Sequence, residues 1–156
     1  MIQYYDRFLL YEEYIKYLSQ FDKDLKSMSE DTMAEIVADY SMDPDCDWID
    51  IGGSQDPIGF LVICNKEMTS ECHPMADYQI AQAYIRGEYR RQGFMTKTVT
   101  EYINNHKGIY SFDVIKGNLT ARAFWIDLFN KMGAEMYPLA EIRENVECLE
   151  LFGYSV

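Results

Sequence analysis

The residues best suited to chemistry lie in a basic turn near the middle of the chain. Residues 85–97 read IRGEYRRQGFMTK, so an apolar strand runs into Arg90, Arg91 and Gly93, and a helical pattern follows. The first N–H groups of a helix have no partners within the helix, and its dipole adds about half a positive charge there. Together with the arginines these groups can bind a phosphate, and Gly93 lets the backbone approach it closely. An ordinary turn with solvent-exposed arginines is the alternative interpretation.

The elements that must position this turn follow from the spacing of apolar residues. Strands are expected over residues 1–10, 48–51, 58–65, 78–85, 110–115, 136–139 and 146–152. Helices are expected over residues 11–21, from about Ser29 to the Asp-Pro-Asp at 43–45, over 94–105 and over 119–132. The order β-α-α-β-β-β-α-β-α-β-β predicts an α/β (α+β) fold, a mixed central sheet of about seven strands with four helices covering both faces. The 156 residues contain no linker-like segment, so one domain spanning 1–156 is expected.

The charge of the chain is strongly acidic, since 14 basic and 26 acidic residues give a net charge of −12. Such a field repels nucleic acid and favours a cationic small molecule or a basic peptide as partner, although acidity also serves solubility. Nine of the acids lie within residues 27–65, a segment without Lys or Arg. If this segment rims the site it attracts a cationic substrate; a solvated acidic face is the alternative.

Nothing in the sequence indicates a membrane span, a secretion signal or a metal site. No apolar run approaches about 20 residues, so no membrane span is expected. The first ten residues include Asp6 and Arg7, which a signal peptide would not place there. We therefore expect a cytoplasmic protein whose four cysteines are free thiols. Cys72 and His73, taken with Cys46, lack the paired spacing of a zinc site, so no metal is predicted.

Two motifs resemble those of the GNAT superfamily of N-acetyltransferases. Arg90-x-x-Gly93-x-Met95 is similar to motif A of that family, Q/R-x-x-G-x-G/A, which follows its fourth strand. The sequence NLTA at 118–121, with an aromatic pair at 124–125, is similar to motif B, in which Asn-x-x-Ala opens the second cofactor-side helix. The expected element order is also that of the family. The Met-Thr pair at 95–96 resembles the branch that acetylates protein N-termini and polyamines.

This resemblance implies a GNAT-like, splayed sheet that binds acetyl-CoA. In the family the fourth and fifth strands separate, and the pantetheine arm lies between them. By resemblance, the backbone of 83–85 pairs with the pantetheine amides, the N–H groups of 91–96 hold the pyrophosphate, and Asn118 hydrogen-bonds the arm. An N-cap is the other role open to Asn118. The implied cofactor-binding residues are Ala83, Tyr84, Ile85, Arg90, Arg91, Gln92, Gly93, Phe94, Met95, Thr96 and Asn118.

The reaction implied by the resemblance is direct transfer of an acetyl group from acetyl-CoA to a primary amine of a small molecule or peptide. The backbone N–H of Tyr84 is expected to stabilise the oxyanion. The general base and general acid stay open, because Gln79 stands where the family often has Glu and Trp125 where it often has Tyr. The alternatives are Asp77 or Glu71 as the base, and water, Tyr84 or Tyr137 as the acid.

The same two departures support an alternative function. A catalytically impaired GNAT-like module would bind CoA as a sensor or interaction domain and would not need a base or an acid. Dimers are common in the family, so the resemblance also implies a homodimer.

Overall fold

The computed structural model describes residues 4–65, 75–137 and 149–156. Four α-helices lie in these residues: α1 (Tyr5–Leu18), α2 (Glu30–Met42), α4 (Phe94–Asn105) and α5 (Leu119–Lys131). The strands in the same residues are β1 (Cys46–Ile51), β2 (Gly59–Asn65), β3 (Tyr78–Ile85), β4 (Ile109–Ile115), β5 (Glu135–Tyr137) and β6 (Leu149–Ser155). Short 3₁₀ helices occupy Lys23–Ser27 and Gly87–Tyr89.

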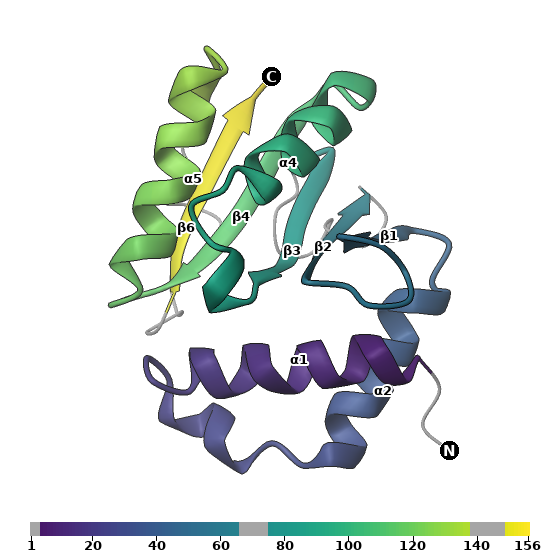
Figure 1. The fold of residues 1–156 in the computed structure, drawn as a ribbon. Coiled ribbons are helices and arrows are strands. Elements are labelled where there is room, and N and C mark those ends of the chain that lie inside the picture. Colours follow the sequence, from purple (N-terminus) through teal and green to yellow (C-terminus); the bar gives the residue numbers. More distant parts are fainter. Residues whose placement is uncertain (1–3, 66–74, 138–148) are drawn as a thin grey trace.

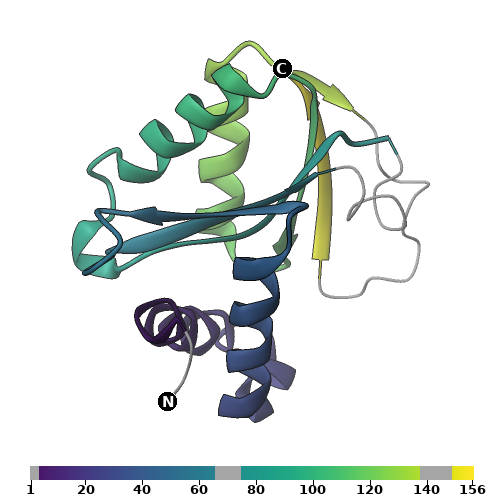
Figure 2. The same ribbon diagram turned by 90° about the vertical axis from the view of Figure 1, so that its right-hand side faces the viewer.

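The strands form one mixed sheet in the order β1-β2-β3-β4-β6-β5. The pair β3 and β4 is parallel, and the other neighbouring pairs among the described strands are antiparallel. Helices α1 and α2 lie on one face of the sheet, and α4 and α5 lie on the other (Figures 1 and 2). This is the two-sided mixed sheet that the element order predicts.

Each face of the sheet has its own hydrophobic core. Successive side chains of a strand point to opposite faces, so the continuous apolar run of β2 supplies both cores. Phe60 and Val62 pack with α1 and α2, whereas Leu61 and Ile63 pack with α4 and α5. The two cores hold the helices in place on both sides of the central strands, where the basic turn begins.

The strand predicted over residues 1–10 is wrong for its described part, because α1 begins at Tyr5. Phe8, Tyr11 and Ile15 recur at intervals of three and four and are all buried. Phe8 also fits a two-residue alternation with Ile2 and Tyr4, so the apolar pattern alone could not separate strand from helix. Residues 1–3 lie outside the described part of the chain. The described residues therefore contain six strands, where about seven were expected.

Most of the other predicted elements are confirmed. The bounds of β3 and α4 are those expected from the sequence. The α2 helix has Ser29 as its N-cap, whose hydroxyl oxygen accepts a hydrogen bond from the Thr32 N–H at 3.1 Å. No helix within the described ranges has both the length and the apolar composition that crossing a bilayer requires.

Candidate active site

The two parallel strands separate part-way along their length. β3 pairs with β4 only from Tyr78 to Ile80, opposite Tyr110 to Phe112. Beyond this point β3 continues along β2 as far as Ile85, while β4 continues along β6. The register of β2 and β3 also shifts here, which leaves Ala81 as an extra residue on β3. A bulge bends a strand and increases its twist, so it turns β3 away from β4. We call the point of separation the fork, and the space beyond it the gap.

Beyond the fork, the backbone N–H and carbonyl groups of successive β3 residues point alternately toward β2 and toward the gap. The Arg86 N–H donates to the Ile58 carbonyl at 2.9 Å, so these two residues form a hydrogen-bonded pair of the antiparallel β2–β3 ladder. In such a ladder every second residue of a strand has its N–H and carbonyl directed toward the neighbouring strand. Two residues earlier, Tyr84 is paired with Phe60, so its N–H and carbonyl point toward β2. The N–H of Ala83 lies on the opposite side, toward the gap. Of the predicted backbone contacts, the structure therefore places Ala83 on the gap side and Tyr84 on the β2 side.

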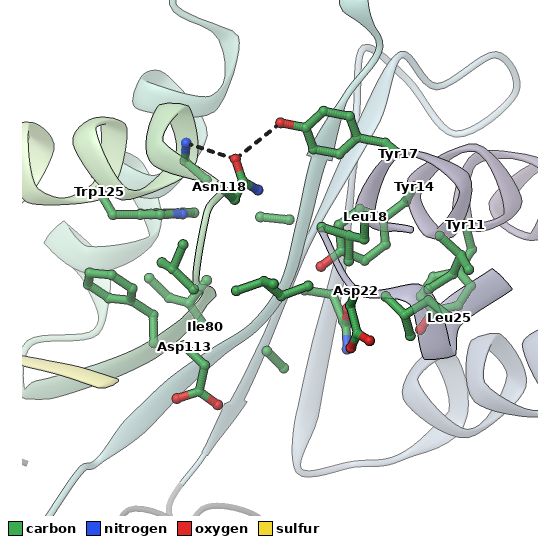
Figure 3. Close-up of a pocket in the computed structure, with 18 of the residues that line it drawn as sticks. Tyr11, Tyr14, Tyr17, Leu18, Asp22, Leu25, Ile80, Asp113, Asn118 and Trp125 are labelled. Atoms are coloured by element: carbon green, nitrogen blue, oxygen red, sulfur yellow. Dashed lines mark hydrogen bonds between the residues drawn. The ribbon is translucent and has the colours of Figure 1, made fainter. Parts of the chain in front are cut away.

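A pocket of about 730 Å³ occupies the region between α1 and the gap. Residues of β3 and β4 form one wall and tyrosines of α1 form another (Figure 3). The remaining lining comes from the start of α5 and from the segment after α1. Its lining side chains include Tyr11, Tyr14, Tyr17, Asp22, Ile80, Gln82, Ala83, Phe112, Asp113, Asn118 and Trp125.

The basic turn leads from the end of β3 to the start of α4. Gly93 is the N-cap of α4 with φ = +84°, and no side chain among the described residues caps this helix end. A Cβ at Gly93 would have no other atom within 4 Å, so the surface above the turn is open. Arg91, Gln92 and Thr96 are exposed, whereas the Met95 side chain is packed in the core of α4. Residues 91–96 therefore offer backbone N–H groups at an open helix N-terminus, as predicted from the sequence.

Arg90 ties this turn to the rest of the site. Its guanidinium lies 4.6 Å from the ring centroid of Tyr17 and 5.5 Å from that of Tyr84. Its Nε donates to the carbonyl of Ile85 at 2.9 Å. The side chain thus connects the turn with the end of β3 and with α1, a positioning role that the motif alone does not reveal.

Asn118 is the N-cap of α5 and is 4% exposed. Its Oδ1 accepts hydrogen bonds from the Ala121 N–H at 3.3 Å and from the Tyr17 hydroxyl at 3.3 Å. The capping role is therefore confirmed. Since Asn118 also lines the pocket at the carboxyl end of β4, its side chain lies on the same edge of the gap as the basic turn. Its predicted contact with a cofactor stays a prediction.

Two substitutions separate these roles of Asn118. Asn118→Ala should lower the free energy of unfolding by about 1–2 kcal/mol, because it removes the cap and a buried acceptor. Asn118→Asp keeps an oxygen acceptor at a helix N-terminus, so it should keep most of the stability. It replaces the amide donor, however, and should weaken acetyl-CoA binding by about tenfold if that donor contacts the pantetheine arm. Urea unfolding and calorimetric titration measure the two effects; unchanged affinity in Asn118→Asp would leave Asn118 with capping alone.

Two predicted alternatives for the base and the acid, Asp77 and Tyr137, lie away from the gap. Asp77 Oδ2 accepts from the Ile109 N–H at 2.8 Å, at the paired end of the two strands. Trp125 lines the pocket and is also part of the core. Tyr137 belongs to β5 at the edge of the sheet, and Glu71 lies outside the described residues.

The nine acids of the segment at 27–65 are not among the residues that line this pocket. Asp47, for example, accepts from the Tyr102 hydroxyl at 2.7 Å on the α4 side, and Asp50 pairs with Arg7 at 3.0 Å. The carboxylates in the lining are instead Asp22 and Asp113. Sequence reasoning missed both. The signal for Asp113 was its position as an acid inside the otherwise largely apolar strand β4.

Two tyrosines of α1, Tyr11 and Tyr14, have neutral hydroxyls at this site. Burial raises the pKa of Tyr14, and a hydrogen bond from the Ala83 backbone lowers it by less. Burial also raises the pKa of Tyr11. Because tyrosine already titrates near pH 10, both hydroxyls keep their protons at neutral pH. Tyr14 therefore brings a hydroxyl from α1 to the gap side of β3.

No protein-family model matches the sequence, and a search of curated proteins finds no match. The fold is nevertheless similar to solved acetyltransferases. One from Thermus thermophilus aligns with a TM-score of 0.68 at 14% identity, covering 96% of this chain and 88% of that chain. The PaiA N-acetyltransferase of Thermoplasma acidophilum, solved in complex with coenzyme A, aligns with a TM-score of 0.62 at 9% identity, covering 98% and 92%. A GNAT-family acetyltransferase of Staphylococcus aureus Mu50 aligns at 0.59 with 14% identity, covering 96% and 90%. The chain has the fold of the GNAT-family acetyltransferases.

Proposed function

We propose that this protein is an N-acetyltransferase that uses acetyl-CoA as its co-substrate. The observation that carries the proposal is the fork: two parallel strands separate after three paired residues, beside an open helix N-terminus at the same sheet edge. Gaps at the carboxyl ends of parallel strands are where α/β proteins bind ligands. The structural neighbour PaiA, which was solved with coenzyme A, supports this choice of co-substrate.

The residues present suit the chemistry of such a co-substrate. The backbone N–H groups of 91–96 and the dipole of α4 suit a pyrophosphate, and Gly93 leaves space for it. Beyond Ile80, β3 is no longer paired with β4, so a pantetheine arm would lie along its gap side as an added strand. Asn118 lies at the carboxyl end of β4, where its amide reaches the same space.

The proposed reaction is a direct transfer. The acceptor amine, after giving one proton to solvent, attacks the acetyl carbonyl carbon, so that a C–N bond forms and the carbonyl oxygen becomes an oxyanion. The C–S bond then breaks, and the remaining surplus proton on nitrogen reaches the leaving thiolate, which yields the amide and the CoA thiol. We assign the oxyanion donor to the Ala83 N–H in place of Tyr84, because Ala83 faces the gap; the oxyanion would replace the Tyr14 hydroxyl as the acceptor of this N–H. Placing the two substrates together supplies much of the rate.

The acceptor in this proposal is a cationic primary amine of a small molecule or peptide. The side of the pocket that the tyrosines of α1 line leaves room for it beside the gap. Aromatic rings and carboxylates both attract a cation, and both are present in the lining.

Release of the CoA thiol tests this function. Wild-type protein is incubated with acetyl-CoA and a panel of primary amines, and the free thiol is measured against samples without amine. Amine-dependent release is expected. Thermal melting with acetyl-CoA alone is run in parallel, since a ligand that binds the native state raises the midpoint. If acetyl-CoA raises the melting midpoint but no amine causes release of the CoA thiol, the result would instead support a CoA-binding module without catalysis. Gln79 and Trp125, which stand where the family often has Glu and Tyr, are compatible with that alternative.

A further inference from the structure

Two cysteines face each other across the strands β1 and β2. Cys46 is the first residue of β1, and its partner in the antiparallel register is Cys64. Both are free thiols, and their sulfur atoms lie in contact at 2.7 Å. Neither residue lines the pocket or belongs to the basic turn. The pair is therefore a cluster of nucleophilic groups that the proposed function does not use.

The backbone at this pair suits a disulfide bond. The Asn65 N–H donates to the Asp45 carbonyl at 2.9 Å, so these two residues form a hydrogen-bonded pair of the β1–β2 ladder. Because the two kinds of pair alternate along an antiparallel ladder, the next pair, Cys46 and Cys64, is a non-hydrogen-bonded one. The Cα atoms of such a pair lie about 4.5 Å apart. A disulfide spans Cα distances of about 4.4–6.8 Å, so the bond can form with little movement of either strand.

The pair is buried but lies at the edge of the sheet. Both side chains belong to the core that packs against α1 and α2, where Cys46 is 8% exposed and Cys64 is 2% exposed. The strand β1 is at the edge of the described sheet (Figure 1), and Cys46 is at its first position. Strand ends with few neighbours open locally at low free-energy cost, so a small oxidant reaches Cys46 more easily than Cys64.

The two thiols differ in acidity. Burial raises the pKa of Cys46, and the hydrogen bond that it accepts from the Cys64 thiol lowers this pKa by less. Burial also raises the pKa of Cys64, and donating that hydrogen bond raises it further. Cys46 therefore becomes a thiolate more easily, and the thiolate is the reactive form. Because both pKa values are raised, oxidation at neutral pH should need sustained exposure to the oxidant.

We propose that Cys46 and Cys64 are an oxidative modification site, at which a hydroperoxide converts the two thiols into a disulfide that joins β1 to β2. This inference does not depend on the proposed function. First, the Cys46 thiolate attacks a peroxide oxygen, the O–O bond breaks, and a sulfenic acid and a hydroxide form. The Cys64 sulfur then attacks the sulfenic sulfur, so that the S–S bond forms, the S–O bond breaks and a second hydroxide leaves. The two thiol protons convert both hydroxides to water, and the two electrons lost by the sulfur atoms reduce the peroxide.

The disulfide should make the protein more resistant to heat. It would close a loop between residues 18 positions apart, which restricts the unfolded chain. The melting midpoint of the oxidised protein should lie about 5–10 °C above that of the same sample after reduction with dithiothreitol. Comparing one oxidised sample before and after reduction keeps any methionine sulfoxides the same on both sides.

Peptide mapping of the wild-type protein tests the proposal. The folded protein is treated with hydrogen peroxide, catalase removes the oxidant, and the remaining thiols are alkylated after denaturation. Residues 27–65 contain no Lys or Arg, so trypsin releases residues 27–66 as one peptide, in which Cys46 and Cys64 are the only cysteines. The disulfide should prevent alkylation of this peptide and make it two hydrogen atoms lighter than the dithiol, apart from any methionine sulfoxides. Dithiothreitol before alkylation should restore both alkylation sites.

Cys64→Ala and Cys46→Ala are the matched variants. Without the Cys64 thiol, Cys46 should be oxidised further to the sulfinic acid, whereas Cys64 alone should stay a thiol for longer. Neither variant should show the reversible rise in melting midpoint. A wild-type peptide that keeps both alkylation sites, that carries a sulfinic acid at Cys46, or that is linked only to Cys72 or Cys148 would each overturn the proposal. These wild-type results do not require either variant to fold.

Discussion

Gly93→Asp should abolish acetyl-CoA binding, with affinity falling by at least about 100-fold. Gly93 caps α4 at φ = +84°, and a new side chain there would extend into open space above the helix N-terminus. This is the space that the proposed function assigns to the pyrophosphate. A carboxylate would occupy the N–H groups and repel the phosphates, and like charges at such distances cost several kcal/mol. Calorimetric titration with acetyl-CoA measures the loss.

Gly133→Asp is the matched control for this experiment. Gly133 also has a positive φ of +71°, and a Cβ there would have no other atom within 4 Å. It follows α5, away from the basic turn. Both variants carry the same new charge and the same backbone strain, about 1–3 kcal/mol for a side chain in this region. Only Gly93→Asp should lose the cofactor; equal affinity in both variants would refute the phosphate site.

Gly59→Ala should destabilise the protein by about 2–3 kcal/mol or more. Gly59 is paired with Ile85 at the edge of the β2–β3 ladder. A Cβ there would overlap the Tyr84 carbonyl oxygen and would lie 2.7 Å from Ile85 Cδ1 and 3.1 Å from Ile85 Cα. The ladder directs that carbonyl toward β2, so backbone must move to relieve the overlap. Urea unfolding gives the change in the free energy of unfolding.

Gly87→Ala gives the reference for this second experiment. Gly87 lies just beyond the same strand end, and a Cβ there would meet nothing within 4 Å. The free energy of unfolding of Gly87→Ala should lie within about 0.5 kcal/mol of the wild-type value. If Gly59→Ala were equally stable, β2 and β3 would not approach each other as closely as the structure has them. The orientation of the Ala83 N–H toward the gap would then lose its support.

The departure from the family motif at Trp125 has a physical explanation in the structure. Trp125 fills the wall of the pocket next to Phe112, with 5.6 Å between ring centroids, so α5 brings no hydroxyl at this position. Hydroxyls come instead from α1, through Tyr14 beside Ala83 and Tyr17 beside Asn118. Tyr14 and Tyr17 thus bring hydroxyl groups to the gap from the layer of α1.

The features that could be predicted from the sequence are local ones. The helix that starts after Gly93, the cap at Asn118 and the bounds of β3 depend on residues within a few positions of each other. A glycine in a left-handed conformation and the unpartnered N–H groups at the start of a helix each involve about one turn of chain. A short motif is therefore enough to indicate them. A helix was expected from residue 11, but the start of α1, from Tyr5, was missed because Phe8 fits both periods; its packing against the sheet decided between them.

By itself the sequence determined where the basic turn and its helix lie, because backbone sterics and helix-end hydrogen bonds involve neighbouring residues. Tertiary structure alone decided which groups meet at the fork. The Tyr17–Asn118 hydrogen bond joins residues 101 positions apart, and Asp113 lines the same pocket as Tyr14 although α1 and β4 are distant in the chain. Contacts between residues so distant in the sequence depend on how two cores pack on opposite faces of one sheet, and that packing is a property of the whole chain.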